Sequence, residues 1–400
     1  MENFYNNFQN RLLSFIIVSG VLNNLLNAYI IEFSLTFLVL IIVIIDIIFN
    51  LSRRKIKIPS NYAIIIGLMF CFYLLIIITL FYSPSPKYKY IKSMNFIVNC
   101  VTLCYPLFIK KINIKKVMPI VKYTAIVLSV FFIYQRYSYW LPSNAEYRGP
   151  DSSYIKLSVV YLALGVLVSI SLIYESFKKN WLQVFILLFM ILALGSRGSL
   201  LFSIVTLICF HFHEIFKIKI RKLKGSQKVS LLLLMIIFIG VFINFRNKIF
   251  NIISTGIARF KSLINFTEDQ SSLGRLHHYD YSFETILSSP INFIFGNGIG
   301  SYGILSQGID ARKYPHNIFL ESWFELGILG AILLIFITTS VLFIKNTSNT
   351  LKGIYFFLFL SAMKTGNITD LWLLFLFLGL ILKTHKGNTF NKFYIKKNAK

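Results

Sequence analysis

The chain has 400 residues, of which 56% are hydrophobic and only 14% are charged. A soluble domain carries about 25% charged residues, because it must cover its surface with polar groups. The apolar residues also come in long blocks, such as residues 33–49, which contain a single charge, Asp46. This composition excludes a water-soluble globular protein. The net charge of +26 does not indicate a nucleic-acid partner, because the basic residues lie in short clusters between the apolar blocks.

Apolar segments of membrane-spanning length recur along the chain. The hydrocarbon layer is about 30 Å thick, so a spanning helix needs roughly 20 apolar residues. Continuous apolar runs favour helices over barrel strands, in which apolar and polar residues alternate. The sequence therefore predicts an all-α polytopic protein with one integral membrane domain, 1–400. About twelve spans are predicted, or eleven if the short turn between the first two is not real: 12–29, 31–50, 61–82, 94–109, 117–136, 157–174, 181–196, 200–216, 229–245, 317–343, 353–366 and 369–382.

Lysine and arginine predict the orientation of these spans. More than half of the 41 basic residues lie at Arg11 and in alternate loops, at 53–57, 110–116, 178–179, 217–228, 345–352 and 383–400. Cytoplasmic loops are enriched in Lys and Arg, so these loops and both termini are predicted to be cytoplasmic. Lys87, Lys89 and Lys92 are exceptions, because they fall on the opposite side.

The opposite face then carries one large extracytoplasmic loop, residues 246–315, and a shorter one at 137–155. Loops of that length between spans are usually functional or disordered. Within the large loop, apolar residues recur at helical spacing and predict an amphipathic helix. These residues are Leu276, Tyr279, Phe283 and Ile286.

Two arginines on the predicted outer face are candidate anion ligands. Arg197 lies among small residues, 195–199, between two spans. An arginine facing lipid there costs roughly 3 kcal/mol or more, whereas small neighbours let helices approach and leave the guanidinium able to reach a ligand. Arg275 is near the start of the amphipathic helix, where the helix dipole itself favours an anion. The alternatives are an arginine that extends to the membrane surface and a solvated loop charge.

A histidine marks the point where the large loop re-enters the membrane, in Tyr-Pro-His-Asn at 314–317. His316 can act as a general base at neutral pH, with Asn317, Glu321 and Asp280 as supporting residues. Glu321 could orient the ring if the local helix permits. The alternative is a histidine that only anchors the helix at the headgroup level.

Two further patterns are weaker. Arg148, in the shorter outer loop, is a fourth candidate on the same face. Residues 298–303 match G-x-G-x-x-G, but they lack the strand–helix context and the acidic residue about 20 positions on that a dinucleotide-binding fold needs. We interpret this segment as a tight turn pressed against a helix or a ligand.

The arrangement resembles the O-antigen ligase and polymerase family of bacterial cell-surface polysaccharide assembly. The likeness covers the whole chain in topology and is densest over residues 190–200 and 274–333, with LALGSRGSLL, SSLGRLHHYDYS and YPHNIFLESWFELG as its main pieces. The resemblance implies a GT-C-like glycosyltransferase in the bacterial cytoplasmic membrane. Its donor would be a glycan on undecaprenyl diphosphate, and it would invert the anomeric centre without a metal or other cofactor.

The resemblance also implies roles for four residues. Arg197 and Arg275 match family arginines that engage the diphosphate, and His316 matches a histidine placed to activate the acceptor hydroxyl. Arg148 matches more loosely. Physical chemistry is consistent with these roles, because guanidinium pairs bidentately with phosphate oxygens and stabilises the charge that develops on a leaving diphosphate.

We interpret the chain as a polymerase that joins lipid-linked repeat units of an O-antigen or capsular polysaccharide. Its bias toward Ile, Phe, Lys and Asn favours this weakly over a ligase that moves the glycan to lipid A core. A flippase for lipid-linked oligosaccharides is the alternative from another class, but no internal repeat indicates one. The expected partners are the lipid-linked donor, membrane lipids, and a chain-length regulator and flippase of the same pathway.

Overall fold

The computed structural model describes residues 2–29, 35–53, 57–138, 152–216, 270–344, 347–385 and 393–394. Apart from a short antiparallel pair, β1 (Lys57–Ile58) with β2 (Phe393–Tyr394), these residues form helices and their connections. They divide into two compact units: Met1–Thr124 with Gln270–Lys400, and Ala125–Asp269. The prediction of a single domain stays a prediction.

The first unit is built around α4 and α15, which pack side by side. Tyr62 of α3 donates its hydroxyl proton to the carbonyl oxygen of Leu103 in α4 at 2.5 Å, and Asn99 of α4 donates to the carbonyl oxygen of Ile368 at 2.8 Å. Its helices are α1 (Glu2–Tyr29), α2 (Leu35–Arg53), α3 (Ser60–Thr79), α4 (Tyr88–Phe108), the start of α5 (Ile114–Ser138), α10 (Gln270–Leu287), α11 (Pro290–Phe295), α12 (Tyr302–Gln307), α13 (Ile318–Thr339), η2 (Ser340–Phe343), α14 (Asn349–Thr365) and α15 (Trp372–Thr384).

The second unit contains the rest of α5 and three helices, α6 (Ser152–Phe177), α7 (Trp181–Leu194) and α8 (Arg197–Phe216). α6 packs against both α7 and α8. The face of α6 that is buried in this unit is rich in small and aliphatic residues, which allows close helix packing without a hydrophobic driving force from lipid.

Seven of the described helices are long and apolar enough to cross a membrane, namely α1 to α6 and α13. α7, α15 and residues Arg197–His211 of α8 are shorter apolar helices. The chain is therefore an all-α, multi-pass membrane protein, as the sequence predicts. Each predicted span coincides with a helix except 229–245, which lies outside the described residues, so the count of twelve stays a prediction.

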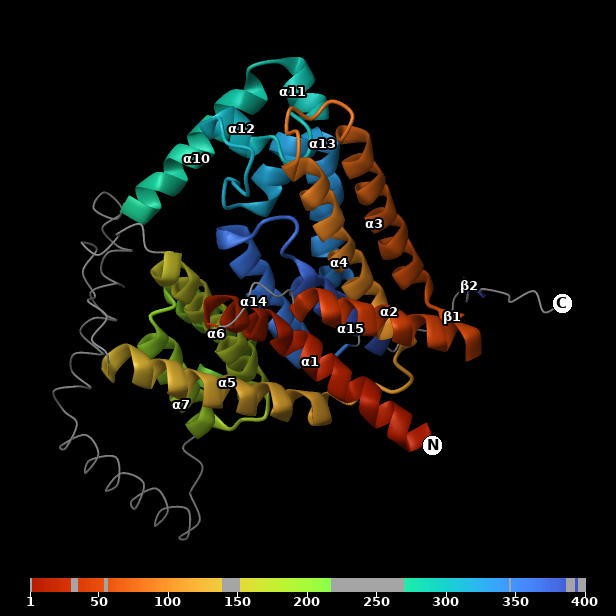
Figure 1. The fold of residues 1–400 in the computed structure, drawn as a ribbon. Helices are drawn as coiled ribbons and strands as arrows, with labels where there is room; N and C mark the ends of the chain where they lie inside the picture. The colour runs from red at the N-terminus through yellow and green to blue at the C-terminus, as the bar shows by residue number, and fades with distance from the viewer. Residues whose placement is uncertain are drawn as a thin grey trace, which may run out of the picture. The chain divides into compact units, whose positions relative to one another are not determined.

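The described part of the large loop forms short helices at one end of α13. Figure 1 shows α11 near the turn that joins α3 to α4, with α12 close by and the longer α10 extending away from this turn. α10 and α11 both pack on α13. Tyr82, at the end of α3, donates a hydrogen bond to the carbonyl oxygen of Phe295 at 2.6 Å, which ties this turn to α11.

A break in α13 holds the glycine-rich turn in place. Gly327 has φ 71° and ψ −176°, so the helix stops there and starts again. The freed carbonyl oxygens of Phe324 and Glu325 accept hydrogen bonds from the backbone N–H groups of Asn297 and Gly298, at 2.8 and 2.9 Å. A Cβ atom at Gly327 would collide with the backbone of α11, so only glycine fits. The interpretation of residues 298–303 as a turn pressed against a helix is confirmed.

The predicted orientation can be tested with fusions. A reporter that is active only outside the cytoplasm should be active when fused after Asn265 and inactive when fused after Lys397, because positively charged loops stay inside. A reporter that works only in the cytoplasm, fused at the same two positions, should give the reverse pattern. The opposite pair of results would contradict the orientation.

Candidate active site

His316 lies at the junction between the large loop and α13. The next residue, Asn317, caps the helix: its Oδ1 accepts hydrogen bonds from the backbone N–H groups of Phe319 and Leu320, at 3.0 and 3.1 Å. Asparagine is among the preferred residues for this position, because it satisfies N–H groups that the helix leaves unpaired. His316 itself has φ 62°. This left-handed conformation is uncommon outside glycine and persists where the surroundings hold it.

The rings of Tyr314 and His278 lie near the half-buried His316 ring, and the charges of Arg275 and Lys313 act on it electrostatically. The ring centroid is 4.6 Å from that of Tyr314 and 5.9 Å from that of His278 in α10. His278 in turn has its Nδ1 atom 2.8 Å from the hydroxyl oxygen of Tyr302, a fully buried residue of α12. We call this set the His316 cluster: His316, Arg275, His278, Tyr302, Lys313 and Tyr314.

The electrostatics of this cluster favour a neutral imidazole. Burial, as the largest cause, and the positive charges of Arg275, His278 and Lys313 together lower the pKa of His316 to about 4. Burial also lowers the pKa of His278 and raises the pKa of Tyr302 to about 12. At neutral pH His316 therefore has a free nitrogen lone pair, which is the form that accepts a proton.

α10 brings Arg275 and His278 to this place. The two residues are three apart and Ser282 follows four later, so all three share one helix face. The same face packs on α13 through a small apolar core of Ile286, Tyr302, Leu320 and Phe324. α10 starts at Gln270, so Arg275 lies in its second turn and not at its free N–H groups. The helix dipole therefore favours an anion at Arg275 less strongly than the sequence indicated.

The predicted amphipathic helix is confirmed as a helix, but its buried face differs. Ile286 is fully buried and Tyr279 packs against the small core. Leu276 and Phe283 are 49% and 44% exposed. The packed face of α10 is instead the one that carries Arg275, His278 and Ser282. An apolar side chain beside a membrane is stable against lipid as well as protein, so hydropathy alone does not identify the packed face.

Glu321 is engaged elsewhere than at His316. It is fully buried in α13, and its Oε1 atom lies 2.5 Å from the Nζ atom of Lys92 in α4. Its Oε2 atom accepts a hydrogen bond from the backbone N–H of Ile368 at 2.9 Å. Glu325, one turn on, also contacts the Nζ atom of Lys92, at 2.7 Å. Both carboxylate oxygens of Glu321 therefore have other partners, Lys92 and the backbone N–H of Ile368, and Glu321 does not orient the His316 ring as the sequence suggested.

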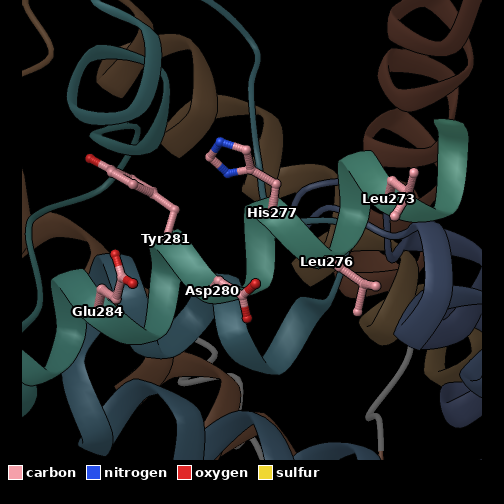
Figure 2. A pocket seen from close by; sticks show the side chains of 6 residues that line it. All are labelled: Leu273, Leu276, His277, Asp280, Tyr281 and Glu284. Atoms are coloured by element: carbon pink, nitrogen blue, oxygen red, sulfur yellow. The ribbon is translucent and has the colours of Figure 1, made fainter. Parts of the chain in front are cut away.

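Asp280 lies on another side of α10. It is five residues after Arg275, or about 140° around the helix, and it lines an open hollow of about 510 Å³. Figure 2 shows Asp280 and Leu276 extending from one side of the helix, and His277 and Tyr281 from another. The described residues that line the hollow are Leu273, Leu276, His277, Asp280, Tyr281 and Glu284, and all belong to α10. None of these six residues is a member of the His316 cluster, although the ring of Tyr281 lies 6.1 Å from that of Tyr302.

Arg197 begins α8 in the second unit. Gly195 before it ends α7 in a left-handed conformation, and the buried Ser196 donates a hydrogen bond to Ser199 at 2.8 Å. A Cβ atom at Gly165 of α6 would collide with both serine hydroxyls, so the small residues do allow close approach, as predicted. Arg148 lies outside the described residues. The roles of both arginines stay predictions.

Lys92 is the polar residue of this region that the sequence did not identify as functional. In the sequence, Lys92 stood out only as an exception to the predicted orientation, because it falls on the side on which few basic residues are expected. Its side chain is fully buried between two carboxylates, so it does not act as a loop charge at all. Lys89 is likewise occupied, because its Nζ atom donates to the carbonyl oxygens of Leu80 and Ser83, at 3.0 and 3.3 Å.

Comparison with known proteins bears on the same part of the chain. The profile of a family described as O-antigen ligase matches residues 182–335, from α7 into α13, a range that includes Arg197, Arg275 and His316. No curated protein matched the chain. Members of this family are glycosyltransferase-like enzymes that act on lipid-linked glycans. Over residues 182–335, which are less than half of its length, the chain is similar to the family described as O-antigen ligase.

Proposed function

We propose that the chain is a polysaccharide polymerase that joins undecaprenyl-diphosphate-linked oligosaccharide repeat units at the outer face of the cytoplasmic membrane. The observation that carries this proposal is the His316 cluster. A neutral imidazole is held in a left-handed backbone conformation where the large loop meets α13, within electrostatic reach of the charge of Arg275. A polyprenyl diphosphate has its tail in lipid and its charge at this level, so base and leaving group would meet here.

In the proposed step, His316 takes the proton of the attacking sugar hydroxyl. The hydroxyl oxygen forms a bond to the anomeric carbon of the donor, and the bond from that carbon to the diphosphate breaks on the opposite face, which inverts the configuration. The diphosphate leaves with the bonding electron pair, and Arg275 stabilises its growing charge. Arg197 and Arg148 are the further proposed ligands of the diphosphate.

Donor binding also makes His316 a stronger base. Without substrate the pKa of His316 is about 4, partly because of the neighbouring positive charges. A bound diphosphate would offset the charges of Arg275 and Lys313 and raise that pKa toward the neutral range, where general bases work best. Proton transfer is therefore favoured only when the donor is in place.

The polymerase and the ligase differ in the acceptor to which they transfer the glycan. A polymerase transfers to a second lipid-linked repeat, whereas a ligase transfers to lipid A core. The description of the matched family as O-antigen ligase favours the second candidate, and the two would share donor and site.

Deletion of the gene should distinguish these candidates. If the chain is the polymerase, the lipopolysaccharide of the deletion strain should carry core with a single repeat unit, because ligation continues without elongation. Bare core together with stored lipid-linked polymer would contradict the polymerase assignment and identify a ligase. Restoring the intact gene should return long chains in either case, and gel analysis of the extracted lipopolysaccharide is the measurement.

A further inference from the structure

A buried charged triad connects α4 to the segment of α13 that follows His316. Lys92 of α4 and the two carboxylates of α13, Glu321 and Glu325, have fully buried side chains. Glu321 and Glu325 are one turn apart, so both face α4. The backbone N–H of Ile368 also donates a hydrogen bond to the Oε2 atom of Glu321, at 2.9 Å. Burying charges is tolerated only when they are well paired, so this arrangement fixes the position of the segment 318–326 against α4.

A second anchor on the same helix fixes the chain before His316. Asp310 accepts hydrogen bonds from Ser85 Oγ at 2.5 Å and from the backbone N–H groups of Lys87 and Tyr88, at 2.9 and 3.3 Å. These groups form the start of α4, where the helix leaves N–H groups unpaired and attracts a carboxylate. The loop from Asp310 to His316 therefore begins at one end of α4.

His316 lies between these two anchors. The chain is attached to α4 six residues before the histidine, at Asp310, and five residues after it, at Glu321. The break at Gly327 separates segment 318–326 from the rest of α13, so this short segment depends on its side attachments. A strained backbone conformation such as that of His316 persists only when its surroundings fix both sides.

We propose that Lys92 and Asp310 are positioning residues that hold His316 in its reactive place by anchoring both sides of its loop to α4. The inference rests on the proposed function for its effect on turnover. It does not need Lys92 or Asp310 to touch the substrate. Donor binding through Arg275 should be spared, because α10 is held on segment 318–326 by apolar packing of Ile286 and Phe324, in which Lys92 takes no part.

The test begins with Lys92→Met and Asp310→Asn in protein reconstituted with lipid-linked repeat units. Displacing a catalytic group by about 1 Å costs about 100-fold in rate. Each substitution should therefore lower kcat about 100-fold and leave the KM for the lipid-linked donor unchanged. A raised KM with normal kcat would overturn the proposal. Asp310 is half-buried, so Asp310→Asn should disturb folding less than Lys92→Met does. Asp310→Asn therefore tests the proposal by itself if Lys92→Met does not accumulate in the membrane.

A second measurement needs no substrate. The ring protons of His316 can be titrated by NMR in the purified protein and assigned by comparison with His316→Gln. Burial is the main cause of the low pKa, and Arg275, His278, Lys313 and Tyr314 face the ring. Releasing the loop should raise the pKa of His316 from about 4 toward its ordinary value of about 6.5. A pKa that stays near 4 in both variants would overturn the proposal.

Asp46→Asn is the matched control, because Asp46 is also a buried charge in a spanning helix. It binds Tyr5 and Gln9, at 2.5 and 3.0 Å, and lies near the other end of α4, at Tyr105. This variant should leave kcat and the titration of His316 unchanged. If the unsubstituted protein transfers no glycan, the proposed function fails, whereas the NMR titration still tests the positioning of His316.

Discussion

Replacing His316 with glutamine is expected to remove nearly all polymer, with turnover lowered by about 10² to 10⁴-fold, the usual contribution of a general base. Glutamine keeps a hydrogen-bonding side chain but cannot take the proton from the attacking hydroxyl. Donor binding should change little, because Arg275 stays in place on α10. Turnover and donor affinity are measured in a reconstituted assay with lipid-linked substrate, and His316→Ala should fail in the same way.

His277→Gln is the matched control for this substitution. His277 is exposed, lines the hollow on α10 and is not a member of the His316 cluster, so its variant should keep near-normal turnover. If His316→Gln also turns over at a near-normal rate, His316 is a positioning residue and the base must be sought among Glu321, Asp280 and His278. His278 has its ring centroid 5.9 Å from that of His316, whereas Glu321 is paired with Lys92.

Removing the guanidinium of Arg275 should have the second large effect. Arg275→Ala is expected to lower kcat by about 10² to 10³-fold, as for the loss of a preorganised donor to a developing negative charge. Arg275→Lys should restore activity poorly, because lysine keeps the charge but loses the bidentate fork. The protein must still be present in the membrane, which immunodetection checks. Full-length polymer from the lysine variant would mean that Arg275 is only a surface charge.

The same variant changes the pH dependence in a defined direction. The positive charge of Arg275 lowers the pKa of His316, so its removal should raise that pKa. Because the neutral form is the base, kcat/KM of the unsubstituted enzyme should fall only as the pH drops through about 4. In Arg275→Ala the fall should begin at higher pH. Arg11→Ala, at an exposed arginine of α1, is the control and should leave both rate and pH profile unchanged.

The membrane-spanning helices could be predicted because hydropathy and length directly reflect the thickness of the bilayer. The position of His316 could also be predicted, because the apolar run 317–343 follows it directly. What the sequence could not show is how α10 faces its neighbours. Leu276 and Phe283 are as apolar as Ile286, and near a membrane apolar residues are stable on either side of a helix.

The buried triad could not be predicted for a different reason. Lys92 and Glu321 are 229 residues apart in the sequence, and no local pattern links them. From the sequence, Glu321 was a candidate partner of His316, because it follows five residues later and could orient the ring if the local helix permitted. In the structure the helix begins only at Ile318, and the Glu321 side chain is directed to Lys92. Long-range pairing of charges therefore decides which carboxylate is available for chemistry.

We propose that His316 and Arg275 together transfer a glycan from a lipid diphosphate to a lipid-linked acceptor, and this transfer can be measured. It is tested most directly with the purified protein in liposomes that contain undecaprenyl-diphosphate-linked repeat units, by measuring released undecaprenyl diphosphate and glycan length together. The account predicts one released lipid for each new linkage and glycans longer than one repeat, with both lost in His316→Gln. Glycan growth that continues unchanged in His316→Gln, or intact protein that binds the donor and releases no undecaprenyl diphosphate, would contradict it.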